Sequence, residues 1–348
     1  MKIIAFEEHY KSRAIEEANK DSPTQRTYDE WKKENRFQPK DPAMGVPPGI
    51  FDLGGQRIAA MDEAGIDVQI LSHTAPGPEE LDPKISVELA QQANETVHGA
   101  VTRYPGRLKG FATLPMRDPN AAAQELERTV NQLGFVGALI NGHVAGRYLD
   151  DKYFWPVFEA AESLDVPIYL HPNRPPQAVV DTYYNGFAPI VSGFLAQAGL
   201  GWHFDTGVHC LRLILGGVFD KFPRLQIIAG HHFELLSWIA WRAQYSFPPN
   251  ETGLKKWPLD YIRQNFYGGL LAGDYQDQKS GEIDPSWTLS FNAFRSMVDL
   301  LSVDRVLFTA DYPYGNMIAA RQFFDRMPLN PVDKEKIGHL NAERLLKL

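Results

Sequence analysis

The sequence is poor in cysteine, in clustered positive charge and in long apolar runs. Cys210 is the only cysteine among the 348 residues, so no disulfide can form within the chain. This excludes the disulfide-stapled folds of small secreted proteins and favours a reducing, cytoplasmic compartment. Cys210 itself lies in an apolar stretch, where we expect a buried small hydrophobic residue.

Positively charged residues are fewer than negatively charged ones, and they are not clustered in the sequence. The chain has 35 Lys and Arg against 43 Asp and Glu, which gives a formal net charge of −8. A nucleic-acid partner requires a basic face, so we expect none. Apolar stretches stay well below the roughly 20 residues that span a bilayer, and we see no secretory signal pattern. We therefore expect no membrane partner.

Apolar residues make up 44% of the chain and gather in short runs separated by helical patterns. Eight strands alternating with helices predict an α/β fold whose parallel sheet closes as a (β/α)₈ TIM-like barrel. An open doubly wound sheet is the alternative, which the lack of a glycine-rich nucleotide loop after the first strand disfavours. The expected strands are residues 2–6, 68–72, 108–114, 136–140, 167–170, 225–230, 265–270 and 305–310. The clearest expected helices are 82–103, 120–133, 153–164 and 233–245.

Two long connections interrupt this alternation. Residues 10–54 are polar and then rich in Pro and Gly, and residues 172–200 form a second long connection after the fifth strand. Connections of this length usually carry function. We expect a single domain, 1–348, in which residues 10–54 are an inserted loop or lid after strand 1.

Polar residues directly follow several of the predicted strands. Glu7 and His9 follow the first strand, His171 the fifth and Asp311 the last. Barrel enzymes keep their chemistry at the carboxyl ends of the strands, so these four side chains are expected to converge. Glu7 and His9 also share one side of an extended chain. Two imidazoles and two carboxylates suit a divalent ion, Zn²⁺ or Mn²⁺, with Mg²⁺ as a third choice, although a single His can also be a hydrogen-bonded core residue.

A second polar pair follows the sixth predicted strand. His231 and Glu234 are three residues apart at an expected helix start, close enough to hydrogen-bond. A carboxylate behind an imidazole fixes its tautomer and raises its basicity, which predicts an acid–base pair. The alternative is a glutamate that only favours the helix dipole.

These motifs extend into longer matching segments that run from the first strand to the last. With them the chain resembles the amidohydrolase superfamily, and within it the non-oxidative aromatic acid decarboxylases. The branch includes the γ-resorcylate (2,6-dihydroxybenzoate) and 2,3-dihydroxybenzoate decarboxylases. The matching segments are residues 6–9, 133–142, 169–172, 206–213, 230–234, 241–242 and 310–313.

The resemblance implies roles for individual residues. Asp311 is implied as both a metal ligand and the proton donor, with His231 and Glu234 as its catalytic partners. Arg242, directly after a Trp, is implied to reach the carboxylate of a substrate bound in a neighbouring subunit. Asn141 ends the fourth strand, which implies one metal ion per chain and no organic cofactor. The implied metal ligands are Glu7, His9, His171 and Asp311.

The function that the resemblance implies is decarboxylation of a small hydroxylated aromatic acid, with release of CO₂ and a phenol, by a homodimer or homotetramer. The alternative is a mononuclear metal-dependent hydrolase of a lactone or amide, in which Asp311 is the general base. Arg242 favours decarboxylation, because an aromatic carboxylate needs such a partner. The chain departs from the family pattern in four places, all expected to line the substrate pocket and to bear on which substrate it takes. They are the pair His232-Phe233, Gly315, residues 266–271 of strand 7 and the long first loop.

Overall fold

The computed structural model describes residues 1–22, 26, 47–271 and 285–348. Most of the predicted lid, residues 10–54, lies outside the described residues. The part of it that is described contains α1 (Arg13–Ala18), directly after the first strand.

All strand pairs in the described part of the chain are parallel. β1 to β3 form one sheet and β4 to β9 the other, each in sequence order. β3 and β4 are separated only by Phe111, so they are two halves of one strand that joins the sheets. At the other end Phe6 pairs with Thr309, and the resulting barrel is closed. The strands are β1 (Ile4–Tyr10), β2 (Val68–His73), β3 (Leu108–Gly110), β4 (Ala112–Thr113), β5 (Ala138–Asn141), β6 (Ile168–His171), β7 (Ile227–Ala229), β8 (Phe266–Gly269) and β9 (Val306–Leu307).

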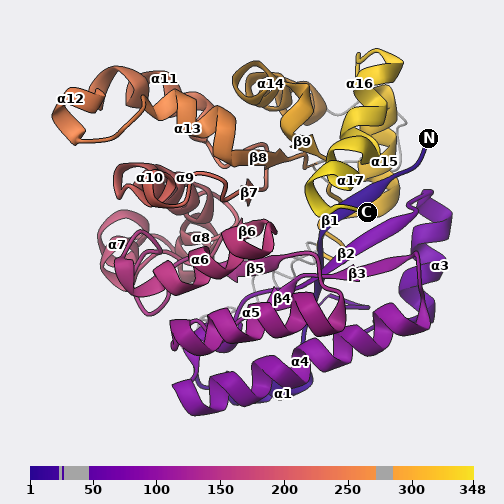
Figure 1. The fold of residues 1–348 in the computed structure, drawn as a ribbon. Helices are drawn as coiled ribbons and strands as arrows, with labels where there is room; N and C mark the ends of the chain where they lie inside the picture. The colour runs from indigo at the N-terminus through magenta and orange to yellow at the C-terminus, as the bar shows by residue number, and fades with distance from the viewer. Residues whose placement is uncertain (23–25, 27–46, 272–284) are drawn as a thin grey trace.

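Helices surround this barrel on its outside (Figure 1). After α1 they are α3 (Gly55–Ala64), α4 (Pro83–Arg103), α5 (Pro119–Leu133), α6 (Trp155–Leu164), α7 (Gln177–Val179), α8 (Pro189–Ala196), α9 (Gly201–Leu215), α10 (Val218–Lys221), α11 (Leu236–Ser246), α12 (Pro249–Thr252), α13 (Pro258–Asn265), α14 (Pro285–Leu301), α15 (Met317–Arg326), α16 (Pro331–Glu335) and α17 (Asn341–Leu346). Short 3₁₀ or π segments are η2 (Pro78–Glu80), η3 (Lys152–Phe154), η4 (Val180–Tyr184), η5 (Val303–Arg305) and η6 (Lys336–Leu340).

Local sequence signals explain where the longer helices begin and end. The Asp118 side chain accepts hydrogen bonds from two backbone amides at the start of α5, with Pro at the first helical position. Gly134 ends the same helix in the left-handed conformation that glycine adopts without strain. Asp82 caps α4 in the same manner. These caps place both helices within a residue of the predicted ranges.

Alternation along the strands divides the core in two. Ile4 and Phe6 of β1 belong to one buried cluster with Phe111 and Tyr169. Ile3 and Ala5, on the opposite side of the same strand, pack in the larger cluster that includes the helices. The eight predicted strands all lie where the sequence placed them, and the barrel prediction is confirmed.

Two predicted elements differ in the structure. Residues 172–200 are not a plain loop, because α7, η4 and α8 lie within them. The helix expected over 233–245 begins at Leu236, and the five residues before it all have positive φ, between 47° and 70°. His231 and Glu234 therefore lie in a left-handed turn and not at the start of a helix.

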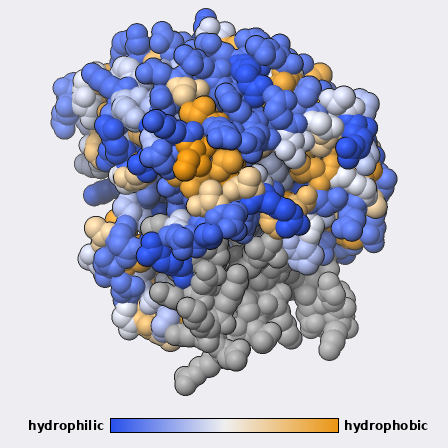
Figure 2. All heavy atoms as spheres, turned by 90° about the horizontal axis from the view of Figure 1, so that it is seen from below, coloured by the Kyte–Doolittle hydropathy of each residue, from blue (hydrophilic) through white to orange (hydrophobic). Residues whose placement is uncertain are grey.

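On the side seen from below, the described residues are mostly hydrophilic, with apolar patches near the centre and on the right of the view (Figure 2). Among the described helices, none combines the length and apolarity that crossing a membrane requires.

Candidate active site

The first strand contributes Glu7 and His9, both buried. β1 runs to Tyr10, so these residues lie within the strand and not after it. The pairing of β1 with β2 shifts register between Ala5 and Glu8, and Glu7 at this bulge has a φ of 62°. A bulge re-aims a side chain, which is how the Glu7 carboxylate reaches the same region as His9.

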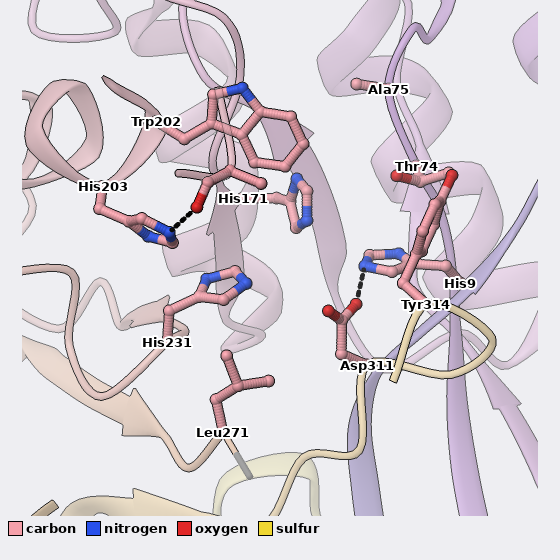
Figure 3. A pocket seen from close by; sticks show the side chains of 11 residues that line it. His9, Thr74, Ala75, His171, Trp202, His203, His231, Leu271, Asp311 and Tyr314 are labelled. Atoms are coloured by element: carbon pink, nitrogen blue, oxygen red, sulfur yellow. Dashed lines mark hydrogen bonds and ion pairs between the residues drawn. The ribbon is translucent and has the colours of Figure 1, made fainter. Parts of the chain in front are cut away.

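Three further strands bring side chains to the same end of the barrel (Figure 3). His171 is the last residue of β6, and its Nε2 lies 3.5 Å from Oε1 of Glu7. His231 follows β7, and its Nε2 is also 3.5 Å from that oxygen. Asp311 follows β9 and places Oδ1 3.2 Å from Nε2 of His9. The convergence expected at the strand ends is present.

The donor set fits a divalent cation. Ligand atoms of Glu7, His9 and His171 all lie within 4.8 Å of one another. Both carboxylate oxygens of Glu7 and Nε2 of His9 are buried without a hydrogen-bond partner. Buried polar atoms are normally satisfied, so these orphaned donors and acceptors indicate a missing partner of positive charge. Asp311 lies outside this group of three and adjoins it through His9.

Electrostatics in the site favour a bound cation. Burial raises the pKa of Glu7 to about 7, although His231 and His9 act in the opposite direction. Burial, His9 and His231 together lower the pKa of His171 well below its usual value. A bound cation would stabilise both groups as its ligands. It would offset the cost of ionising the buried Glu7 carboxylate, and it would bind the neutral imidazole of His171.

His231 and Glu234 are hydrogen-bonded as predicted, through Nδ1 and Oε1. Burial alone would lower the pKa of His231, but Glu7 and Glu234 raise it to about 10. Burial opposes ionisation of Glu234, yet its pKa is lowered by His231 and His203. Nδ1 of His203 lies 2.7 Å from the second carboxylate oxygen of Glu234, a contact that the sequence does not suggest.

A buried hydrogen-bond network stands behind His9. The hydroxyl of Ser72 lies 3.3 Å from Nδ1 of His9, which leaves Nε2 directed at the site. Arg57, fully buried, donates to the carbonyl oxygen of His9 at 2.6 Å and to Gln69 at 3.2 Å. Glu8 points away from the site, where its carboxylate accepts from Gln69 and from a backbone amide of the β9 connection. Glu8 and Arg57 therefore anchor β1 and were not predicted as site residues.

Backbone strain is concentrated in the site. Glu7, His231, Glu234 and Asp311 all have positive φ, at 62°, 47°, 48° and 54°. Non-glycine residues reach this region at a cost of about 1–3 kcal/mol each, and such strain clusters at functional sites. The surrounding barrel overdetermines these conformations, and the sequence shows no sign of them.

The converging side chains open into a small cavity of about 140 Å³. Its apolar wall is made by Ala75, Ala198, Trp202 and Leu271, and its polar wall by Thr74, Tyr314 and the site histidines. The lining residues are His9, Thr74, Ala75, His171, Ala198, Trp202, His203, His231, Leu271, Asp311 and Tyr314.

The four expected departures mostly do not line this cavity. His232 bonds Ser290 through Nε2 at 2.9 Å, and Phe233 is buried in the large core cluster. Gly315 packs against the carbonyl of Ala310, where a Cβ would collide. Of residues 266–271 only Leu271 reaches the cavity, so the expectation is wrong for His232, Phe233 and Gly315. Most of the long first loop lies outside the described residues.

Arg242 lies on the exposed surface of α11, outside the cavity lining. Because α11 begins at Leu236, this residue is in the second turn of the helix, nearer its start than the sequence suggested. Its guanidinium lies 5.7 Å and 5.8 Å from the ring centroids of Trp241 and Tyr245, at cation–π distance.

Comparison with known proteins agrees with this geometry. Residues 50–348 match the family model described as amidohydrolase. A γ-resorcylate decarboxylase from Polaromonas sp. is 34% identical, covering 99% of this chain and 98% of the relative. A dihydroxybenzoic acid decarboxylase from Polaromonas sp., solved with manganese and 2-nitroresorcinol, has a TM-score of 0.81 and 31% identity, covering 100% of this chain and 97% of that one.

A second solved structure gives the same result. The 5-carboxyvanillate decarboxylase of Novosphingobium aromaticivorans, solved with manganese and 4-hydroxy-3-methoxy-5-nitrobenzoic acid, has a TM-score of 0.83 and 32% identity. The similarity covers 100% of this chain and 96% of that one. With strand-end ligands, a closed parallel barrel and a relative above 30% identity over nearly its whole length, the chain belongs to the amidohydrolase family.

Proposed function

We propose that this protein catalyses the metal-dependent, non-oxidative decarboxylation of a hydroxylated aromatic acid. The observation that carries the proposal is the meeting of Glu7 with His9, His171 and Asp311, the last three of which line one small cavity. The relatives and structures described above are named as decarboxylases, which supports this reaction over hydrolysis of a lactone or amide.

Glu7, His9, His171 and Asp311 would hold one divalent ion, and manganese is the choice that the solved relatives favour. When bound, the ion supplies positive charge that orients the substrate oxygens and stabilises negative charge on them. No organic cofactor is required, since the reaction exchanges a carboxylate for a proton. Trp202 and Leu271 line the cavity on opposite sides (Figure 3), and each offers an apolar surface against which an aromatic ring can pack.

Asp311 is placed to act on the ring. Its side chain is 20% exposed and faces the cavity, whereas its partner His9 is buried. In its protonated form it transfers a proton to the ring carbon that carries the carboxylate. The bond from that carbon to the carboxylate carbon then breaks, its electron pair returns to the ring, and CO₂ leaves. Solvent later restores the proton to Asp311.

His231 holds the phenol of the substrate. Its Nδ1 is engaged by Glu234, so Nε2 is the nitrogen that faces the cavity. In the neutral ring this nitrogen can accept the phenolic proton, and in the imidazolium form, which the raised pKa of His231 favours, it can hold the phenolate by donating a hydrogen bond. The buried Glu234 keeps the ring in one tautomer and orientation during the proton transfer.

Cavity size limits the substrate. An engineered protein cavity of about 150 Å³ holds one benzene molecule. The present cavity of about 140 Å³ therefore suits a single substituted ring and not a fused or biaryl acid. A monocyclic hydroxybenzoate is the substrate class that we propose.

We further propose that the chain acts as a homo-oligomer in which Arg242 of one subunit binds the substrate carboxylate in its neighbour. Among the described residues, the cavity lining contains no Lys or Arg. A carboxylate in a closed pocket requires such a partner, and a guanidinium offers two parallel hydrogen bonds. The exposed position of Arg242 beside two aromatic rings is suited to insertion into a neighbour.

We also propose that residues 1–348 form one domain, with residues 10–54 as an insertion after β1. The helices and strands that flank this insertion pack in the same barrel, and β1 to β2 is the pair with the longest register. A cytoplasmic location remains a proposal that rests on the single cysteine.

The decisive experiment measures CO₂ release from a panel of monocyclic hydroxybenzoates, with protein loaded with Mn²⁺ or Zn²⁺. We expect turnover of an acid with a hydroxyl ortho to the carboxylate, and loss of that turnover after chelation with recovery on adding metal. Unchanged turnover by protein shown to be metal-free would contradict the proposal, as would hydrolysis of lactones without any CO₂ release.

A further inference from the structure

The carboxylate of Glu234 is held between two imidazoles. Oε1 is bonded to Nδ1 of His231, and Oε2 lies 2.7 Å from Nδ1 of His203. Glu234 is fully buried. A buried carboxylate is costly unless both of its oxygens are satisfied, so each imidazole contributes to holding it in place.

The second nitrogen of His203 is also engaged. Its Nε2 lies 3.1 Å from the carbonyl oxygen of Ala198. A carbonyl oxygen has no proton to give, so Nε2 carries the hydrogen and donates it. Although the His203 ring lines the cavity beside His231, neither of its nitrogens is free for a substrate (Figure 3).

The hydrogen bonds of His203 limit where the protons shared with Glu234 and His231 can lie. With a proton on Nε2 of His203, the contact between Nδ1 and Glu234 needs one more. That proton lies either on Nδ1, as an imidazolium facing a carboxylate, or on Oε2, as a glutamic acid facing a neutral ring. In both cases Oε2 is occupied and Oε1 is left to accept from Nδ1–H of His231. The bond to His203 thus holds the carboxylate in the orientation that keeps a proton on Nδ1 of His231.

Helix α9 is shaped to deliver His203 to this place. His203 and Gly207 are four residues apart and share one face of α9. A Cβ on Gly207 would lie only 2.7 Å from the carbonyl oxygen of Glu234, so glycine permits the helix to approach that residue closely. His203, one turn before Gly207 on the same face of α9, then presents its imidazole to the carboxylate of Glu234.

We propose that His203 is a positioning residue, which locks the carboxylate of Glu234 and through it the ring orientation and tautomer of His231. The inference rests on the proposed decarboxylation for its kinetic test. The rival assignment is a second metal site, because ligand atoms of His203, His231 and Glu234 lie within 4.8 Å of one another. The hydrogen bonds to Glu234 and Ala198 already account for every nitrogen of His203, which favours the positioning role.

Two amide substitutions separate the bonds of His203. The amide of Asn lies where Nδ1 lies, and His203→Asn can still donate to Glu234. The amide of Gln reaches the position of Nε2, and His203→Gln keeps only the bond to Ala198.

Loss of an orienting partner behind a catalytic imidazole lowers activity by about 10- to 100-fold. We expect His203→Gln to lower kcat by that factor, with KM within about threefold of wild type. We expect His203→Asn to recover at least about five times the kcat of His203→Gln.

Double substitution tests whether His203 acts through Glu234. In a Glu234→Ala background, His203→Gln should cause no further loss of kcat, because coupled residues are not additive. A further loss of the same size there would overturn the proposal. Equal losses in the Asn and Gln variants would overturn it too, since they would show that the Ala198 bond matters instead. Two ions per chain, with one lost from both variants, would assign His203 as a metal ligand.

A crystal structure of the His203→Gln variant supplies a result that does not depend on catalysis. We expect the Glu234 carboxylate to turn and the His231 ring to lose its Nδ1 bond. Unmoved side chains would contradict the positioning role whether or not the enzyme decarboxylates. If wild-type protein fails to decarboxylate any hydroxybenzoate while these rings do move, the proposed reaction is wrong and the positioning role stands.

Discussion

We propose two tasks for Asp311, metal binding and proton donation, and one substitution can separate them. Its carboxylate adjoins the ligand group through His9 and also faces the cavity. In Asp311→Asn the amide oxygen can still coordinate weakly, but no carboxylic proton is available. We expect kcat to fall by about 10²- to 10⁴-fold, the usual contribution of general acid catalysis, with KM changed much less. Steady-state kinetics on protein with measured metal content test this. Near-normal turnover by the metal-loaded variant would assign the proton donor elsewhere, with His231 as the next choice.

Gly230 shows that a site residue can matter through the space it leaves empty. A Cβ there would lie 2.7 Å from Oε2 of Glu7 and would collide with the hydroxyl of Tyr169. We expect Gly230→Ala to lower the free energy of unfolding by about 1–3 kcal/mol, as overpacking does, and to weaken metal binding by displacing Glu7. Chemical denaturation and metal titration measure the two effects.

A matched control for that substitution lies in α4. Gly99 is exposed, and nothing lies within 4 Å of a Cβ built on it. Gly99→Ala should raise the free energy of unfolding by about 0.5–1 kcal/mol, because alanine is the better helix former. If both variants bind metal as the wild type does, the close packing of Glu7 on Gly230 does not matter for the site.

At the scale of elements, the sequence predicted those features that follow from periodicity. The apolar runs located all eight strands, and the polar residues after them located Glu7, His9, His171 and Asp311. In the structure, Asp118 and Gly134 cap α5 within a residue of the range that periodicity predicts. These signals depend only on residues that are close together in the sequence, so the sequence alone reveals them.

Other features depend on tertiary packing and leave no local signal. The left-handed turn of His231 to Leu235 contains residues that ordinarily continue a helix, and only the barrel holds them at positive φ. The bulge at Glu7 arises from pairing with β2, whose residues lie 63 to 64 positions further along the chain. His203 looks like any histidine on a helix until its distance to Glu234 is known. The four departures were assigned to the pocket because proximity in sequence was taken for proximity in space.

Helix α9 also carries a carboxyl that links stability to pH. Burial raises the pKa of Asp205 from 3.8 to about 6, while a hydrogen bond from the Tyr148 hydroxyl acts in the opposite direction. A carboxyl whose pKa is higher in the folded state favours folding fully below about pH 3.8, and this contribution is lost as the pH rises through 6. At neutral pH the buried charge therefore reduces stability.

Asp205→Asn removes this charge and keeps an oxygen for Tyr148. We expect the variant to be more stable than the wild type by about 1–3 kcal/mol at pH 8, since one pKa unit corresponds to 1.36 kcal/mol. The difference should shrink toward zero as the pH falls to about 4. Denaturant unfolding of both proteins across this range measures it. A constant difference at every pH would show that packing, and not ionisation of Asp205, distinguishes the two proteins.

At the scale of the whole molecule, α11 presents an apolar face that nothing in the described chain covers. Trp238, Trp241 and Tyr245 are 61%, 68% and 76% exposed. Large aromatic side chains with an arginine among them are typical of interface centres, where such residues supply most of the binding energy. Helix α9, which packs against α11, carries a second exposed apolar group, formed by Phe204 and Val208. The exposed face of α11 is the surface on which we expect a second copy of the chain to bind.

Subunit mixing tests whether Arg242 completes the site of that second copy. Arg242→Ala alone should raise KM sharply and leave the metal in place, whereas Arg103→Ala, an exposed arginine outside the cavity lining, should leave both unchanged. In a two-fold dimer of Arg242→Ala with Asp311→Asn, one of the two composite sites has both residues intact. Random exchange of equal amounts makes half of all dimers mixed, so about a quarter of wild-type activity should return. Two inactive proteins that stay inactive after confirmed exchange, or a monomer with full activity, would show that each chain binds the carboxylate with its own residues.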